Sequence, residues 1–558
     1  MDPVEAAFRQ AQQQHQAGNA TAARALYEKV LAKVPGHPGA HHGCGLLLLA
    51  QNRTRDALDH LGKAVKAAPG RPLYRFNHGL ALSRAGQTDA AIDAYRQAVR
   101  LKADFADAWN NLGLLLGEAP RQAEDAFTAA VAANPGHVAA RINLARLQCA
   151  ARRRSDAAAT LAPVLTMDSP PAEAWFLQGT IEEDEQRFDA AIACYRRALE
   201  RDGAMRSARN NIGTAQLGLR QYAQAHTTFH TMFAERRGPL HSDPGVFDPS
   251  LVRGGPETSL RTCRARLVDA AEQLRHMIGM GLLEPSWEDA AGFYDAGAAE
   301  LDLRGLDPAK PQVLDGEAAQ AIAGMHEHAV RFADVDIEGG AAIGAGNDWR
   351  AIEEGFLASP TSITAIDGFL SPQAHEALQR FCRESTIFFG HNATGYVTSY
   401  MADGFACSLL YRIAEELQAL MPTVLGGRHL HNMWVYRYGA EGNGVEAHTD
   451  DAAVTFNFWI GPEDASLDPD HGGLVLFAKE QPLDWDWTDI NLRKNAPDVK
   501  TRIGAFLSDA EQVTVAHRPN RAVLFGSNMF HRSDRFAFRQ GFGNRRTNVT
   551  LLFGERGA

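Results

Sequence analysis

A repeat with a nearly constant period runs through residues 1–237 and leaves few folds open to this part of the chain. Small residues recur near the start of each copy, at steps of 34, 34, 34, 32, 34 and 34: Ala11, Gly45, Gly79, Gly113, Ala145, Gly179 and Gly213. An alanine follows each of them ten or twelve residues later, and a large apolar or aromatic residue comes four residues after the alanine. Two packed helices per copy explain the spacing, because the small residues let the helices touch and the large residue fills the space beside them.

This pattern resembles the tetratricopeptide repeat, in about seven copies over residues 1–237, and the nearest single match is AWNNLGLLLGEAP at residues 108–120. The resemblance implies an α-solenoid, a superhelix of helix pairs whose concave face binds a peptide or protein.

Asparagines occupy one position of the repeat, two residues before the small residue: Asn77, Asn111, Asn143 and Asn211. Leu177 interrupts the series. The series resembles the asparagine ladder in the superhelix of O-GlcNAc transferase. A carboxamide both donates and accepts hydrogen bonds, so it can pair with the backbone of a peptide of any sequence. The alternative is that these side chains only cap or hydrate the helix surface.

Charge and cysteine usage argue against several classes of protein. The 558-residue chain has a formal net charge of −11 at pH 7, which gives no support to nucleic-acid binding, because that function favours a basic stripe. Its six cysteines are widely spaced and form no CxxC motif, so we expect reduced thiols in a cytoplasmic protein. We expect no secretory signal, because the first residues lack a basic, apolar leader. We also expect no membrane span, because every apolar run is much shorter than a bilayer-spanning helix requires.

Residues 238–355 lose the repeat and carry a weaker signal. Two stretches have helical periodicity, residues 261–283 and 318–333, and the Gly-rich residues 337–348 are expected to form a linker. We expect a mostly helical region that braces the two ends of the chain.

Short β-rich runs separated by turns fill residues 356–558, which predicts a sandwich or barrel. At the start of one run, His448 and Asp450 lie two positions apart, and residues i and i+2 share one face of a strand. The pair can therefore bind one ion from a single strand end, or it can be a hydrogen-bonded surface pair. A metal site needs a further ligand, and three later histidines could supply it: His471, His517 and His531.

The last strand adds a basic residue. Arg546 opens this strand, and Asn548 and Thr550 lie on the same face. A buried arginine among polar neighbours is costly without an anion to meet it. Arg545 is adjacent, but strand parity places it with the apolar residues, so the sequence favours Arg546.

A His-x-Asp pair, a distant histidine and an arginine on the last strand resemble the Fe(II)/2-oxoglutarate dioxygenases of the prolyl-4-hydroxylase type over about residues 361–558. The stretches YRYGAEGNGVEAHTD, AIDGFLSPQAHEAL and RTNVTLLF carry the resemblance. It implies a double-stranded β-helix, or jelly roll, in which His448, Asp450 and His531 bind Fe(II) and leave positions for 2-oxoglutarate and O2. It also implies that Arg546 pairs with the far carboxylate of 2-oxoglutarate.

Other polar positions are candidates for the same pocket. Tyr436 and Tyr438 share a strand face near the metal pair, and each either hydrogen-bonds the cosubstrate or is a plain core tyrosine. Asn548 is assigned to the cosubstrate pocket with Arg546. Asn457, on the parity of its neighbouring strand residues Thr455 and Trp459, is a candidate for the pocket wall.

The chain departs from the family at an insertion. The stretch of sequence between Asp450 and His531 is long for the family and includes extra residues at 481–512. Trp485 and Trp487 in this insertion either form a lid over the substrate or pin a loop.

The expected fold is multidomain α + β: a tetratricopeptide superhelix at 1–237, a bracing region at 238–355 and a dioxygenase domain at 356–558. We expect an enzyme that uses Fe(II), 2-oxoglutarate and O2 to hydroxylate a side chain of a peptide or protein captured by the repeats. Two alternatives are a 2-oxoglutarate oxygenase that acts on a small molecule, with repeats for assembly, and a non-catalytic repeat scaffold.

Overall fold

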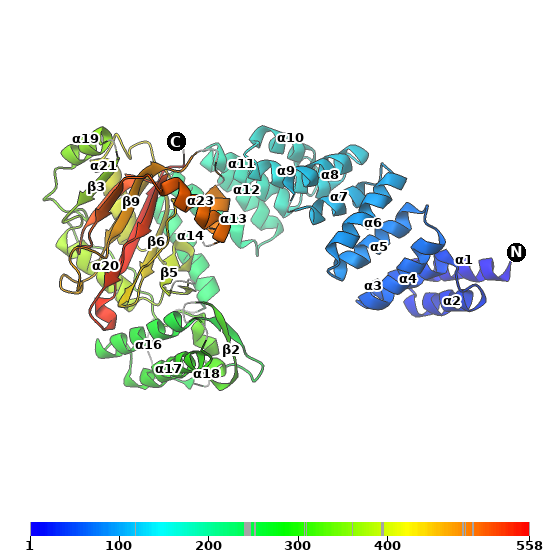
Figure 1. The fold of residues 1–558 in the computed structure, drawn as a ribbon, viewed down its shortest axis with the longest axis horizontal. Coiled ribbons are helices and arrows are strands. Elements are labelled where there is room, and N and C mark those ends of the chain that lie inside the picture. The colour runs from blue at the N-terminus through cyan, green and yellow to red at the C-terminus, as the bar shows by residue number, and fades with distance from the viewer. Residues whose placement is uncertain are drawn as a thin grey trace. The chain divides into compact units, whose positions relative to one another are not determined.

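The computed structural model describes residues 2–117, 119–238, 247–249, 253–305, 307, 310–359, 361–391, 395–482, 485, 487–493 and 496–556 (Figure 1). Contacts between Cα atoms divide the chain into two units, Met1–Gly203 and Ala204–Ala558. The division falls one helix pair before residue 237, where the repeat sequence ends.

The first unit consists of consecutive helices that follow the predicted repeat. They are α1 (Pro3–Gln16), α2 (Ala20–Lys33), α3 (Pro38–Ala50), α4 (Thr54–Ala67), α5 (Pro72–Arg84), α6 (Thr88–Leu101), α7 (Ala106–Leu115), α8 (Pro120–Ala133), α9 (Val138–Ala150), α10 (Arg154–Leu165), α11 (Ala172–Asp184) and α12 (Phe188–Arg201). Each helix packs against the next, and the pairs follow one another in a row from blue to cyan (Figure 1). This unit is a helical solenoid, as the repeat predicts.

Small residues at the repeat positions let the two helices of a pair approach closely. A Cβ atom added to Gly79 would lie 2.9 Å from Cε1 of Tyr95, and one added to Gly113 would lie 2.6 Å from Cε1 of Phe127. Both distances are shorter than a van der Waals contact, so the aromatic ring occupies the space that a side chain would need. The predicted packing of small against large residues is confirmed.

The seventh helix pair belongs to the second unit. Helices α13 (Arg206–Gly218) and α14 (Tyr222–Arg237) continue the repeat, but Phe229 and Phe233 are fully buried in the main core of the C-terminal region. Tyr222 donates a hydrogen bond from Oη to Oε1 of Gln418 at 2.7 Å and stacks on the ring of Tyr411. The last repeat therefore shares its hydrophobic core with residues that follow it in the chain.

A small helical region follows the repeats. Its elements are β1 (Leu260–Thr262), α16 (Arg264–Gly279), η1 (Pro285–Trp287), α17 (Glu288–Leu303), β2 (Gln312–Leu314) and α18 (Gly316–His326). The helices enclose a core of their own, and β1 pairs with β2 in antiparallel fashion. The sequence predicted α16 and α18 but not α17, whose many alanines and glycines blur its periodicity. Among the described helices of the whole chain, none is both long enough and apolar enough to cross a bilayer.

The C-terminal region contains one large and one small antiparallel sheet. The large sheet comprises β3 (Ile363–Ile366), β4 (Gly390–His391), β5 (Val397–Tyr400), β6 (Leu430–Arg437), β8 (Val454–Trp459), β11 (Ala522–Gly526) and β14 (Thr547–Phe553), in the order β3-β11-β8-β14-β6-β5-β4. The small sheet comprises β9 (Leu474–Glu480), β10 (Gln512–Val515) and β12 (Met529–Ser533), in the order β10-β9-β12. The strands lie in the part of the chain where the sequence predicts short β-rich runs.

The remaining elements cover the sheets or connect their strands. They are α19 (Trp349–Ala358), α20 (Pro372–Glu384), η2 (Met401–Asp403), α21 (Ser408–Leu420), β7 (Glu441–Gly442), α22 (Trp487–Leu492), α23 (Pro497–Leu507), β13 (Phe536–Ala537) and η3 (Phe542–Asn544). The short strands β7 and β13 pair with each other.

The two faces of the large sheet have different surroundings. On one face, apolar residues such as Val435 and Val549 join a core that includes Phe381 of α20 and Ile413 of α21. On the other face, residues of β8 and β11 share a second core with residues of β9 and β10 from the small sheet. The large sheet therefore lies between helices and the small sheet, and its second face carries the predicted site.

Candidate metal centre

The backbone brings His448 and His531 side by side. His448 lies in the segment that leads into β8, and His531 lies in β12. The two residues form an isolated antiparallel bridge: His448 N donates to His531 O at 3.0 Å, and His531 N donates to His448 O at 2.9 Å. Asp450 N donates to Ser527 O at 2.9 Å, in the turn between β11 and β12. Main-chain hydrogen bonds thus fix three predicted ligands that come from two separate parts of the sequence.

The side chains of these residues converge on one point. One ligand atom from each of His448, Asp450 and His531 lies within 4.8 Å of the others, and this is the one such group of three among the described residues. Nε2 of His448 is 4.0 Å from Oδ1 of Asp450, and Nε2 of His531 is 3.6 Å from Oδ2. These separations are long for hydrogen bonds. They match the distance of about 3–4 Å that separates two atoms when each lies about 2.1 Å from the same ion.

Hydrogen bonds to the outer atoms orient the three side chains. Nδ1 of His448 lies 2.8 Å from the carbonyl of Glu446, and Nδ1 of His531 lies 3.2 Å from the carbonyl of Met529. A carbonyl can only accept, so Nδ1 carries the proton and Nε2 is the ligating atom of each ring. Oδ2 of Asp450 accepts from Oγ1 of Thr455 at 2.9 Å. The residues therefore fit a divalent metal ion in donor chemistry, spacing and tautomer.

The other two candidate histidines lie in different surroundings. Nδ1 of His471 is 2.8 Å from Oδ2 of Asp534, and its Nε2 is 2.7 Å from Nη2 of Arg535. His517 is 2% exposed, and neither ring nitrogen has a hydrogen-bond partner among the described residues. Burial, with a further contribution from nearby arginines, lowers the pKa of His517 to about 3. The structure thus joins His531, and not His471 or His517, to the His-x-Asp pair.

The two neighbouring arginines point to opposite sides of the sheet. Arg545 contacts α16, where Nη1 lies 2.6 Å from Oδ1 of Asp269 and Nη2 lies 2.7 Å from Oε2 of Glu272. Arg546 is 0% exposed, and it donates from Nε to the carbonyl of Gly472 at 2.7 Å and from Nη2 to that of Gly473 at 3.1 Å. This placement agrees with the parity expected of the two residues.

Arg546 keeps an unsatisfied hydrogen-bonding group. Within the described part of the chain, its Nη1 has no partner, and Nε1 of Trp459, whose ring centroid lies 5.9 Å from the guanidinium carbon, has none either. Burial lowers the pKa of Arg546, and interaction with Tyr438 partly offsets this effect. A buried positive charge with a free donor is suited to an anionic ligand.

A cavity opens beside the three candidate ligands. Its wall combines aromatic residues at β6 with polar residues of β8 and β14: Trp434, Tyr436, Tyr438, Asn457, Asn548 and Thr550. Burial raises the pKa of Tyr436 well above its ordinary value. Both predicted tyrosines therefore lie at the cavity, together with Asn548 and Asn457, and strand parity located them. Trp434 also lines the cavity and was not predicted, although it lies two residues before Tyr436 on the same strand face.

The asparagines of the repeats already contact protein groups. Nδ2 of Asn77 lies 2.7 Å from Nε2 of His42, and Nδ2 of Asn143 donates to Oδ1 of Asn110 at 3.0 Å. Nδ2 of Asn111 is 3.4 Å from Oη of Tyr95. The first two bonds connect adjacent repeats. The fourth residue of the series, Asn211, belongs to α13 in the second unit.

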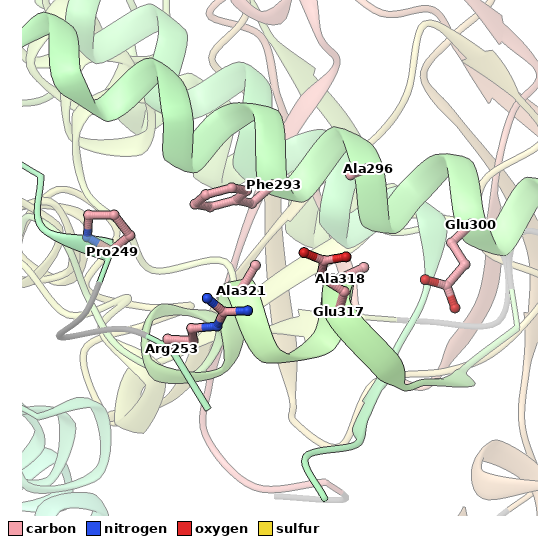
Figure 2. A pocket seen from close by; sticks show the side chains of 8 residues that line it. All are labelled: Pro249, Arg253, Phe293, Ala296, Glu300, Glu317, Ala318 and Ala321. Atoms are coloured by element: carbon pink, nitrogen blue, oxygen red, sulfur yellow. The ribbon is translucent and has the colours of Figure 1, made fainter. Parts of the chain in front are cut away.

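A separate cavity lies in the small helical region. Apolar residues of α17 and α18 form much of its wall, and its charged groups are Arg253, Glu300 and Glu317 (Figure 2). Its described lining contains no histidine, no cysteine and no other residue singled out by the sequence.

The N-terminal part of the chain consists of tetratricopeptide repeats. The tetratricopeptide repeat family matches residues 14–75 and 114–179, a related TPR repeat family matches 79–118, and a further tetratricopeptide family matches 172–204. Such repeats generally bind peptide or protein partners.

Particular proteins share this similarity over limited lengths. The small glutamine-rich tetratricopeptide repeat-containing protein 2 of Mycosarcoma maydis is 34% identical over 83 residues, which are 14% of this chain and 24% of that protein. Among solved structures, PilF of Pseudomonas aeruginosa is 17% identical with a TM-score of 0.34, and the match covers 37% of this chain and 94% of PilF. YrrB, described as a TPR protein with an unusual peptide-binding site, is 19% identical with a TM-score of 0.30, over 33% of this chain and 95% of YrrB.

Proposed function

We propose that residues 356–558 form an Fe(II)- and 2-oxoglutarate-dependent dioxygenase with a double-stranded β-helix of the prolyl-4-hydroxylase type. The proposal rests on the convergence of His448, Asp450 and His531, whose ligand atoms lie within 4.8 Å of one another. Two imidazoles and one carboxylate are the ligand set of non-haem Fe(II) oxygenases, in which the other coordination positions stay open. Two antiparallel sheets that share a core beside this cluster support the same assignment.

The protein residues would hold and orient the reacting groups. Bound Fe(II), with 2-oxoglutarate and O2, would supply the oxidising power to convert an unactivated C–H bond to C–OH, while 2-oxoglutarate leaves as succinate and CO2. Asp450 contributes the negative charge of the site, and the hydroxyl of Thr455 orients its carboxylate. The backbone carbonyls at Nδ1 of the two histidines hold both rings in the ligating tautomer.

Arg546 is the proposed partner of the far carboxylate of 2-oxoglutarate. Its guanidinium is buried, and its Nη1 atom has no partner among the described residues. A carboxylate at Nη1 would neutralise the buried charge and accept the remaining hydrogen bond. Tyr436, Tyr438 and Asn548 line the adjacent cavity and complete the proposed cosubstrate pocket.

The proposed substrate is a side chain of a peptide or protein. The tetratricopeptide repeats supply a partner-binding surface, and their asparagines are proposed to contact the backbone of an extended segment. We place the protein in the cytoplasm, because all six cysteines are free thiols.

Two measurements test the proposal. Purified full-length protein with Mn(II), under anaerobic conditions, should bind 2-oxoglutarate by isothermal titration calorimetry. With Fe(II), O2 and a peptide library, it should release succinate and add one oxygen atom to a peptide. Absence of both 2-oxoglutarate binding and succinate release would refute the dioxygenase and leave a repeat scaffold. Hydroxylation of a small molecule, with no peptide product, would instead support a role of the repeats in assembly.

A further inference from the structure

The described residues of the insertion between β9 and β10 include two helices, α22 and α23, that pack on the small sheet. Ile490 of α22 and Ile503 of α23 join a core with Val475 of β9 and Phe530 of β12. Ala447, which directly precedes the first metal-ligand candidate, packs against the same core. The insertion is therefore anchored on the outer side of the two strands that flank the proposed metal centre.

Polar groups of this region converge on Thr449, the residue between His448 and Asp450. Thr449 N donates to Oδ1 of Asn491 at 3.0 Å, and Nδ2 of Asn491 donates to Oγ1 of Thr449 at 3.2 Å. Oγ1 of Thr449 also donates to Oε1 of Gln481 at 2.8 Å. Nε1 of Trp487 donates to the carbonyl of Thr449 at 3.3 Å.

These contacts satisfy every hydrogen-bonding group of Thr449. Its amide, its carbonyl and both functions of its hydroxyl have partners, although the residue is only 1% exposed. The partners are held in turn: Nδ2 of Asn491 also donates to the carbonyl of Trp487 at 3.0 Å, and Gln481 N donates to Asn528 O at 2.9 Å. A buried and fully bonded residue has little freedom to rotate, so the positions of its two neighbours are restricted as well.

We propose that the insertion is a positioning clamp for the metal centre, in which Asn491, Gln481 and Trp487 fix the peptide of Thr449 and thereby set the spacing of His448 and Asp450. The inference rests on the proposed function, because it assigns the clamp to the same metal site. The three clamp residues contribute no metal ligand and act through Thr449. The role of Trp487 is then to pin the metal-binding segment, one of the two roles that the sequence left open for it.

The clamp predicts that metal affinity depends on the hydroxyl of Thr449. Thr449→Val keeps the shape of the side chain and removes both hydrogen bonds of Oγ1, whereas Thr449→Ser keeps the hydroxyl. Groups that orient metal ligands typically contribute a factor of about 10–100 to metal affinity, so we expect the Kd for Mn(II) to rise about 10- to 100-fold in Thr449→Val and much less in Thr449→Ser. Asn491→Ala, which removes three of the described bonds, should also raise this Kd.

The experiment uses full-length, metal-free protein titrated with Mn(II), with free Mn(II) followed by electron paramagnetic resonance. Thermal unfolding of each metal-free variant shows whether the fold is retained. Asp498→Ala is the matched control, because Asp498 lies on an exposed part of the same insertion and pairs with Arg493 at 2.7 Å; it should bind Mn(II) like wild type. If Asn491→Ala does not fold, the Thr449→Val and Thr449→Ser pair decides the question.

The outcomes separate the clamp from the function on which it rests. If Thr449→Val and Asn491→Ala bind Mn(II) with wild-type affinity, the proposed role of the clamp is wrong, while the proposed metal site is unaffected. Failure of the wild-type protein to bind Mn(II) would overturn the metal site, and the clamp with it. A higher Kd for Mn(II) in Thr449→Val, together with a Kd close to that of wild type in Thr449→Ser, would support both the clamp and the metal site.

Discussion

Replacement of Arg546 by alanine should weaken the binding of 2-oxoglutarate and leave the metal site intact. Arg546 is fully buried, two of its three nitrogens donate to backbone carbonyls, and Nη1 has no hydrogen-bond partner among the described residues. A charge-assisted pair with a carboxylate contributes about 1.5–3 kcal/mol, so its loss should raise the Kd of 2-oxoglutarate about 10- to 100-fold. The Kd for Mn(II) should change little, because Arg546 is not among the three candidate ligands.

Arg545→Ala is the matched control for this experiment. Arg545 is the preceding residue, but its guanidinium pairs with Asp269 and Glu272 of α16. Removing one partner of a buried ion pair costs about 3–5 kcal/mol when the other charge is left alone. The loss should be smaller here, because Asp269 also pairs with Arg437. We therefore expect a lower unfolding temperature for Arg545→Ala and an unchanged Kd for 2-oxoglutarate.

Anaerobic isothermal titration calorimetry with Mn(II)-loaded protein measures both constants. Mn(II) is first titrated into each metal-free variant, and 2-oxoglutarate is then titrated into the loaded protein. If Arg545→Ala raises the Kd of 2-oxoglutarate and Arg546→Ala does not, the assignment of the carboxylate-binding arginine is wrong. If neither variant changes it, neither arginine binds the carboxylate of the cosubstrate.

Three other predictions test the ligands, the repeats and a buried histidine. Alanine at any one of the proposed metal ligands should abolish succinate formation and weaken Mn(II) binding; wild-type metal affinity in such a variant would contradict the ligand set. Alanine at both Asn111 and Asn143 should raise the apparent KM for a protein substrate with little change in 2-oxoglutarate turnover without substrate, and wild-type kinetics would mean that these side chains do not contact the substrate. Burial lowers the pKa of His517 from 6.5 to about 3, so the unfolded state binds a proton in this pH window that the folded state does not. The free energy of unfolding should therefore fall as pH drops below 6.5, by at most about 1.4 kcal/mol per pH unit from this group, and urea titrations should show a weaker pH dependence for His517→Phe.

Much of the candidate site was predicted from the alternation of side chains between the two faces of a strand. Residues two apart on β14 and β6 share a face, so the sequence separated Arg546 from Arg545 and grouped Tyr436 with Tyr438 before any contact was known. The repeats were predictable for a similar reason, because a fixed period of small and large residues specifies how one helix packs on the next. Local periodicity therefore indicates which side of an element a residue occupies.

Contacts between distant segments could not be predicted from local periodicity. Arg545 binds Asp269, which is 276 residues away in a helix with no signal for this pairing. The bonds between Thr449 and Asn491 depend on how the insertion packs on the small sheet, and no pattern in either segment specifies that packing. The groups that contact the side-chain amides of Asn77 and Asn143 also belong to the preceding repeat. The sequence therefore predicted the repeat position of these asparagines but not their hydrogen bonds.

The shared core of the seventh helix pair has a practical consequence for dissecting the chain. A cut after residue 237, where the repeat sequence ends, would strip Phe229 and Phe233 from the core that they share with the C-terminal helices. It would also separate Tyr222 from Gln418 and leave apolar surface exposed on both fragments. A cut at Gly203 follows the division of the contacts and leaves this core whole. Fragments for expression should therefore end at 203 and begin at 204, so that the C-terminal fragment keeps one repeat as part of its own fold.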